Sequence, residues 1–132
     1  MKFAIASEVA EGVVAHARAE HPREACGLLL GTPGSVTHAE PACNVSRSPE
    51  RNFEIDPSTL LRVHREARGQ GLAVVGHYHS HPGGSAEPSR TDAARAVEDG
   101  QLWLIVTGTT VTGWLATADG ALHGRFITVE LG

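Results

Sequence analysis

The chain has 132 residues, 41% hydrophobic and 20% charged, which is the composition of one globular domain covering residues 1–132. The formal charge is −4 and the 11 Lys and Arg residues are scattered, which argues against a nucleic-acid partner. No apolar run reaches signal-peptide length or the roughly 18 residues of a membrane helix, so we expect a cytoplasmic protein without a membrane partner. The two cysteines, Cys26 and Cys43, are too few for a disulfide framework.

Strands and helices are predicted to follow one another without a regular β-α-β repeat. In chain order, hydrophobic periodicity, turn residues and helix caps predict a strand at 2–5, a helix from Ser7 to about His21, strands at 24–30 and 36–42, a loop at 44–52, a brief strand at 53–55, a helix at 57–68, a strand at 72–78, a helix at 89–99, and strands at 102–107, 111–116 and 122–129. The second of these helices has Leu60, Leu61, His64 and Ala67 on one face. This pattern favours a mixed α/β domain, with a largely antiparallel curved sheet packed with about three helices.

Eight histidines are present, and two of them form a pattern typical of metal sites. His79 and His81 are two residues apart at the end of a predicted strand, so their side chains point to one face, about 6.6–6.8 Å apart along the backbone. Asp92 follows in the first turn of the next predicted helix. Three nitrogen and oxygen ligands without a thiolate are typical of catalytic zinc sites, because the fourth tetrahedral position stays open to water.

Each part of this pattern also has a purely structural interpretation. A His-x-His pair alone is common as a polar patch at a strand end. The segment Ser89-Arg90-Thr91-Asp92 matches a capping box, in which Ser89 and Asp92 bond to each other's backbone N–H. Glu24 alone would be an ordinary charged residue at a strand start. The combination of all three features favours a catalytic site.

The combined pattern resembles the signature of the JAMM (catalytic MPN) metalloprotease family. That signature is Glu, a variable interval, His-Ser/Thr-His, seven residues, Ser, two residues and Asp. This chain has Glu24, then His79-Ser80-His81, then seven residues at 82–88, then Ser89 and Asp92. The resemblance covers most of the chain and implies a JAMM/MPN fold similar to the cytidine-deaminase-like arrangement.

The resemblance also implies a role for each residue of the motif. His79, His81 and Asp92 would hold one Zn²⁺ per chain. Glu24 would act as general base and then as general acid, and Ser89 would donate its hydroxyl to the oxyanion of the tetrahedral intermediate. The implied reaction is hydrolysis of a peptide or isopeptide bond after the C-terminal glycines of a ubiquitin-like sulfur-carrier protein, whose tail would be the partner.

Two other functions remain as alternatives. A non-catalytic MPN scaffold would serve as an interaction module, but such relatives typically lack the ligands that this chain keeps. A DNA-repair-associated relative shares a His-x-His-Pro and Ser-x-x-Asp string. The acidic charge balance and the segment Glu24-Ala25-Cys26-Gly27 favour the protease, whereas DNA binding with a steep salt dependence would favour the repair relative.

Several residues near the motif have simpler interpretations. His77 lies on the same strand face as His79, where it could support the metal site or simply be packed or solvated. Cys26 is close to Glu24, and we expect it to be an inert buried thiol. Trp103 and Trp114 fall in predicted strands and are expected in the core, and Ser80 is expected to shape the strand end.

Overall fold

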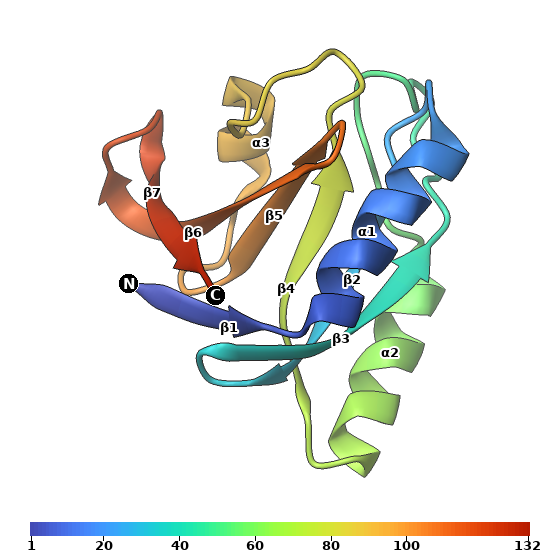
Figure 1. The fold of residues 1–132 in the computed structure, drawn as a ribbon, viewed down its shortest axis with the longest axis vertical. Coiled ribbons are helices and arrows are strands. Elements are labelled where there is room, and N and C mark those ends of the chain that lie inside the picture. Colours follow the sequence, from blue (N-terminus) through green and yellow to red (C-terminus); the bar gives the residue numbers. More distant parts are fainter.

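The structure of the protein, a computed structural model of residues 1–132, consists of a mixed sheet and three helices (Figure 1). In chain order the elements are β1 (Lys2–Ile5), α1 (Ser7–Glu20), β2 (Cys26–Thr32), β3 (Ser35–Ala42), α2 (Pro57–Gly69), β4 (Ala73–Ser80), α3 (Arg90–Arg95), β5 (Leu102–Thr107), β6 (Thr110–Gly120) and β7 (Gly124–Leu131). The order of elements predicted from the sequence is confirmed, apart from the brief strand at 53–55. There the structure has only an isolated bridge between Asn44 and Ile55.

The sheet closes into a seven-stranded barrel in the order β1-β3-β2-β4-β5-β6-β7, which corrects the expected curved sheet. Most neighbouring strands are antiparallel, as predicted, and β4 and β5 are parallel. The short strand β1 closes the barrel because it pairs in parallel with β3 through Ala4 and Ile5, and with β7 through Lys2 and Phe3. These pairings join residues far apart in the sequence, so no local sequence pattern predicts them.

Helices cover both faces of the sheet. On one face, α1 contributes Val9 and Val13 to a buried cluster. The other members of this cluster are Phe3, Leu29, Val36, Tyr78, Leu102, Leu104, Val106, Leu115 and Val129. On the other face, α2 covers Leu28 and Leu30, whereas Trp103 and Trp114 lie in a separate cluster near α3. Leu29 and its two neighbours face opposite ways because side chains alternate along a strand. The expected core positions of both tryptophans are confirmed.

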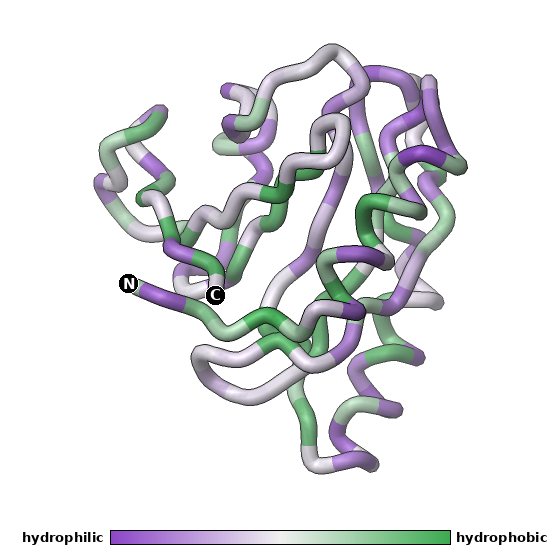
Figure 2. Tube along the Cα trace, viewed as in Figure 1, coloured by the Kyte–Doolittle hydropathy of each residue, from purple (hydrophilic) through white to green (hydrophobic).

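Helix α2 packs through small side chains. Val63 and Ala67, four residues apart, are its buried residues, whereas Leu60 and Leu61 are 38% and 54% exposed. Of the four residues noted on one face in the sequence, only Ala67 is buried. Figure 2 shows hydrophilic positions along the outer turns of α2 and hydrophobic stretches along the central strands.

Helix α3 ends at Arg95, four residues before the predicted end at Asp99. Ala96 leaves the helical conformation, with φ −76° and ψ 85°, and is buried. Its carbonyl oxygen accepts a hydrogen bond from Arg125 Nε at 2.7 Å. This partner lies on β7, so the end of α3 depends on tertiary contacts. No helix is both long and apolar enough to cross a membrane, and both cysteines are free thiols.

Candidate metal centre

The pairing of β2 with β4 brings Glu24 next to the histidine pair. Cys26 lies opposite His79 in this antiparallel ladder. One step further, Ser80 N donates to the carbonyl oxygen of Ala25 at 3.0 Å, and Ser80 Oγ accepts from Ala25 N at 2.8 Å. Ser80 therefore fastens the two strand ends together, which confirms that it shapes the strand end. Glu24 directly precedes Ala25 in the chain and His81 directly follows Ser80, so these two hydrogen bonds hold Glu24 and His81 near each other.

Three predicted ligands converge at the end of β4. The Nε2 atoms of His79 and His81 are 2.9 Å apart, and each lies 3.2 Å from Oδ2 of Asp92. Ligand atoms about 2.0–2.1 Å from one tetrahedral zinc ion are separated by roughly 3.3 Å. The three atoms are therefore spaced as if around one ion, and the residues can bind a metal.

The electron pairs of these atoms also suit a cation. Nδ1 of His81 lies 2.9 Å from the carbonyl oxygen of Ser85, which can only accept, so Nδ1 carries the proton and Nε2 presents a lone pair. Burial lowers the pKa of His79 and so favours its neutral form. Burial alone would raise the pKa of Asp92, but the adjacent rings of His79 and His81 and the backbone N–H of Ser89 hold that pKa below its usual range. The result is a carboxylate facing two ring nitrogens.

His79 is held by stacking. The ring of Phe53 lies parallel to that of His79, with centroids 4.3 Å apart and an interplanar angle of 22°. Nδ1 of His79 is buried without a hydrogen-bond partner. The orientation of this imidazole therefore depends on Phe53 and on the strand backbone, with no hydrogen bond to its outer nitrogen.

The capping box and the ligand role of Asp92 coexist in one side chain. Ser89 Oγ accepts from Asp92 N at 3.0 Å, and Asp92 Oδ2 accepts from Ser89 N at 2.8 Å. The same Oδ2 atom faces both histidines. Because Ser89 Oγ acts only as an acceptor in this cap, its hydroxyl proton remains available to a further acceptor in the cleft.

Glu24 is buried, with 5% of its surface exposed, and lines the same cleft as His81, Ser89 and Asp92. Burial raises the pKa of its carboxyl to about 7. A carboxyl with this pKa can both take up and release a proton near neutral pH.

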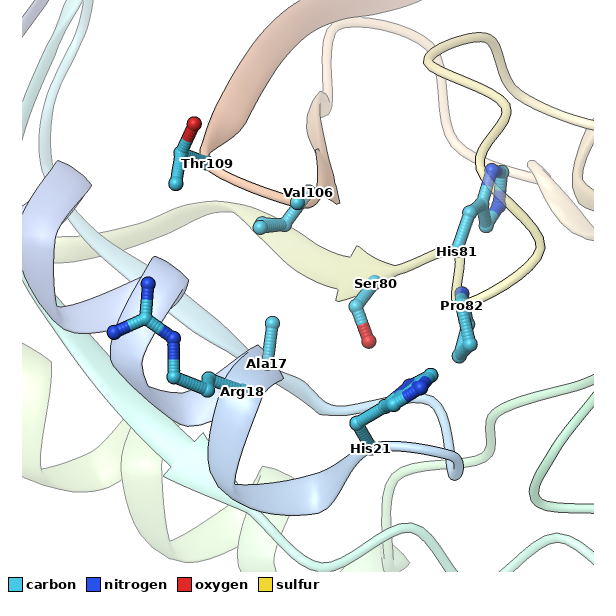
Figure 3. Close-up of a pocket in the computed structure, with 9 residues that line it drawn as sticks. Ala17, Arg18, His21, Ser80, His81, Pro82, Val106 and Thr109 are labelled. Atoms are coloured by element: carbon cyan, nitrogen blue, oxygen red, sulfur yellow. The ribbon is translucent and has the colours of Figure 1, made fainter.

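The metal cleft is polar and shares two lining residues with a second cavity. The cleft has a volume of about 300 Å³ and is lined by Glu24, Glu50, Arg51, His81, Pro82, Gly83, Ser85, Glu87, Ser89 and Asp92. His81 and Pro82 also border a cavity of about 370 Å³, which Ala17, Arg18, His21, Ser80, Val106, Gly108 and Thr109 complete (Figure 3). Figure 3 shows His21 and Pro82 close to Ser80 at one side of this cavity. The two spaces are therefore neighbours on either side of His81 and Pro82.

Three residues near the site were missed by the sequence analysis. They are Asn44, which bonds to the backbone of Glu24, Phe53, which stacks on His79, and Arg95, whose Nη1 donates to the carbonyl oxygen of Phe53 at 2.8 Å. The sequence contains one local signal for Asn44, because an Asn side chain at a strand end often stabilises a turn by hydrogen-bonding to nearby backbone groups. The other two contacts join distant parts of the sequence.

His77 and Cys26 do not join the cluster of ligands. The ring of His77 packs edge-on against Trp103, with centroids 4.2 Å apart, and burial lowers its pKa to about 3. Of the two interpretations of His77, packing is the one seen. Cys26 is fully buried, and burial raises its thiol pKa to about 12. The predicted burial of Cys26 is confirmed, and its raised pKa disfavours the reactive thiolate.

The fold and the His-His-carboxylate cluster are those of a JAB/MPN domain. A family profile described as prokaryotic homologs of the JAB domain matches residues 6–118. The chain belongs to this family, which confirms the resemblance seen in the sequence.

Two relatives are similar over most of their length. A desampylase from Haloferax volcanii is 34% identical over 110 residues, covering 79% of this chain and 79% of the relative. A CysO-cysteine peptidase from Mycobacterium tuberculosis is 37% identical over 105 residues, covering 78% of this chain and 71% of the relative. These names support a hydrolase.

Solved structures show the same fold. A protein from Desulfitobacterium hafniense superposes with a TM-score of 0.83 at 28% identity, over 98% of this chain and 92% of that protein. A JAB1/MPN domain protein from Archaeoglobus fulgidus superposes with a TM-score of 0.63 at 18% identity, over 99% and 98% of the two chains. The JAB/MPN fold therefore extends over the whole chain.

Proposed function

We propose that the protein is a zinc-dependent metallopeptidase or isopeptidase that hydrolyses the bond after the C-terminal glycines of a ubiquitin-like sulfur-carrier protein. The observation that carries this proposal is the convergence of His79, His81 and Asp92 within 3.2 Å, beside the buried Glu24. The names of the desampylase and the CysO-cysteine peptidase support the substrate class.

Zinc is the metal that the donor set favours. Two imidazole nitrogens and one carboxylate oxygen are typical of catalytic zinc sites with one position left for water or substrate. A bound zinc ion would supply a Lewis acid for the substrate carbonyl and for water at that position.

Glu24 moves the proton in the proposed reaction. Its carboxylate accepts a proton from the attacking water while the water oxygen bonds to the carbonyl carbon. When the C–N bond breaks, Glu24 returns that proton to the departing amine nitrogen. Burial, which raises the pKa of this carboxyl in the metal-free protein, favours its acceptance of the proton from water.

Ser89 stabilises the charge that develops on the carbonyl oxygen. Its Oγ is fixed by the hydrogen bond from Asp92 N, so the hydroxyl is already oriented before substrate arrives. The free hydroxyl proton then donates to the oxyanion of the tetrahedral intermediate. Removing such a donor costs roughly 10²–10³ in kcat in other hydrolases.

The carrier tail would follow a groove along α1. The metal cleft and the second cavity, which is the one drawn in Figure 3, share His81 and Pro82. The second cavity shares Arg18 and Thr109 with a third space of about 460 Å³. An extended chain advances about 3.3 Å per residue, so these spaces suit several residues of a tail. Glycines, which have no side chain, would place the least bulk beside His81 and Pro82, the two residues that border both spaces.

The decisive test uses the purified protein and three substrates built on one ubiquitin-like carrier. These are a carrier with extra residues after its final glycine, a carrier with one added amino acid, and a carrier joined to a lysine side chain. We expect about one zinc per chain by elemental analysis and cleavage after the glycine. Glu24→Gln should lower kcat by about 10²–10⁴-fold while the metal content stays unchanged.

The matched control is Glu98→Gln, the same change at an exposed carboxylate that does not line the metal cleft, which we expect to stay within about threefold of wild type. A chelated sample should lose cleavage and regain it when zinc is restored. Full activity of Glu24→Gln, or full activity after chelation, would disprove the mechanism.

A further inference from the structure

Asn44 is the centre of a loop that joins β3 to α2 and forms one wall of the metal cleft. Its Nδ2 donates to the carbonyl oxygens of Asn52 at 2.9 Å, Glu24 at 3.0 Å and Pro49 at 3.3 Å. Its Oδ1 accepts from the backbone N–H of Ser46 at 3.0 Å and of Glu54 at 3.1 Å. One amide group thus fixes both ends and the middle of residues 46–54.

The same amide holds Glu24 from its backbone. The carbonyl oxygen of Glu24 accepts from Asn44, and the N–H of Glu24 donates to Pro49 at 2.6 Å. Pro49 is itself bonded to Asn44. Glu24 lies outside the paired part of β2, which begins at Cys26. Its backbone position is therefore set by the loop as well as by the ladder.

The loop also reaches the metal ligands. Phe53, which stacks on His79, lies between the two residues whose backbone groups Asn44 binds, Asn52 and Glu54. Arg95, at the end of α3, donates to the carbonyl oxygen of Phe53. A single side chain therefore connects the backbone of Glu24 with the ring that supports a metal ligand.

We propose that Asn44 is a positioning residue, which fixes Glu24 at the distance from the metal ligands that proton transfer requires. This inference rests on the proposed function of Glu24. Asn44 does not line the metal cleft, so it acts through the backbone of Glu24 and through the loop. A displacement of a reacting group by about 1 Å can lower the rate roughly 100-fold, so this hold is important for catalysis.

The variants Asn44→Asp and Asn44→Ala test the proposal. Asp keeps an oxygen for Ser46 and Glu54 but removes the amide donors to Glu24, Pro49 and Asn52. Asn52→Ala is the matched control, because the side chain of Asn52, in the same loop, makes no hydrogen bond. We expect Asn44→Asp to lower kcat about 10- to 100-fold, with KM and zinc content within about threefold of wild type.

Two further measurements separate positioning from general damage. Hydrogen exchange at the Glu24 amide should become at least about tenfold faster in Asn44→Asp and unchanged in Asn52→Ala, since the partner Pro49 is released. In the Glu24→Gln background, Asn44→Asp should not lower the residual rate further. Asn44 acts through the position of the Glu24 carboxylate, and that carboxylate is already absent in this background.

The outcomes are distinct. Wild-type kcat and unchanged Glu24 exchange in Asn44→Asp would overturn the inference while leaving the proposed function intact. An equal further loss in the Glu24→Gln background would also overturn it. If the wild-type protein cleaves no carrier substrate, the proposed function fails, and the exchange of the Glu24 amide still decides whether Asn44 holds this residue. If Asn44→Ala does not fold, the kinetics and hydrogen exchange of Asn44→Asp alone test the positioning role of Asn44.

Discussion

At the scale of single residues, Glu24 occupies a position that disfavours its charged form. Burial raises its pKa from 4.5 to about 7, so the folded protein without metal binds this proton more tightly than the unfolded chain does. The free energy of unfolding must then fall as the pH rises from about 4.5 to about 7. Such a residue is suited to proton transfer and makes the fold less stable at neutral pH.

We therefore expect Glu24→Gln to stabilise the metal-free protein at pH 8. The full shift corresponds to about 3 kcal/mol, and screening by solvent at the open cleft reduces the expected gain to about 1–2 kcal/mol. The gain should shrink as the pH falls through about 7, and it should vanish below about 4.5, where the wild-type carboxyl is protonated in both states. Urea unfolding at several pH values measures it.

Glu50→Gln serves as the reference in that experiment, because Glu50 is exposed at the rim of the cleft. We expect it to change stability by less than about 0.5 kcal/mol at each pH. A gain from Glu24→Gln that is the same at pH 5 and at pH 8 would show that the buried charge of Glu24 is not its cause.

The residues of the motif could be named from the sequence, because their spacing is local. His79 lies near the end of β4 and His81 directly follows that strand, while Ser89 and Asp92 share a helix cap, so each pair is oriented by local structure. Asn44 could not be assigned in this way. Its bond to Glu24 spans 20 positions of the chain, and nothing in the polar loop sequence indicates which backbone groups it meets.

At the scale of secondary structure elements, the ends of β2 and β4 depend on one hydroxyl. Ser80 Oγ is the acceptor for the buried N–H of Ala25. We expect Ser80→Ala to lower the free energy of unfolding by about 1–3 kcal/mol, because that donor loses its partner. It should also lower kcat, since Glu24 directly precedes Ala25, the residue that loses its hydrogen bond.

Chemical denaturation and steady-state kinetics measure these two effects. Ser48→Ala is the matched control, as Ser48 is exposed and its hydroxyl makes no hydrogen bond. It should leave both quantities unchanged. A Ser80→Ala protein with wild-type stability would show that water or a shifted backbone satisfies the Ala25 N–H.

The ends of helices and strands were predicted well where nearby residues determine them. They were predicted poorly where a contact with a distant residue determines them. β1 and β5 have the predicted bounds, and the proline at the start of α2 marks its beginning. The end of α3 depends on Arg125, a residue from the last strand. Closure of the barrel depends on two-residue pairings of β1, which are too short to leave a pattern.

At the scale of the whole molecule, a bound metal would join two parts of the fold. His79 and His81 lie at the end of β4, whereas Asp92 belongs to α3 on the far side of a long loop. A ligand that binds only the folded state stabilises it by about 2.7 kcal/mol at 100 times its Kd. We expect saturating zinc to raise Tm by roughly 10 °C.

Differential scanning fluorimetry of the metal-free protein, with and without zinc, measures this shift. Asp92→Asn should abolish most of it, and Ser85→Ala should preserve it, because Ser85 contacts His81 only through its backbone carbonyl. An equal shift in wild type and in Asp92→Asn would place the metal elsewhere.

The strand pairing that brings Glu24 to His81 has a consequence for how the sequence can change in length. The interval from His79 to His81 is fixed by the two-residue repeat of an extended chain, and the interval from Ser89 to Asp92 is fixed by the helix cap. Glu24 is brought to these residues by the pairing of β2 with β4, which does not depend on the number of residues between them. The chain can therefore lengthen between Glu24 and His79 at tips that lie away from this ladder end. The β2–β3 turn at Gly34 and the α2–β4 turn at Gly71 are such tips, both open and with positive φ (Figure 1). New segments could be grafted there, with new recognition properties, while the catalytic geometry stays unchanged.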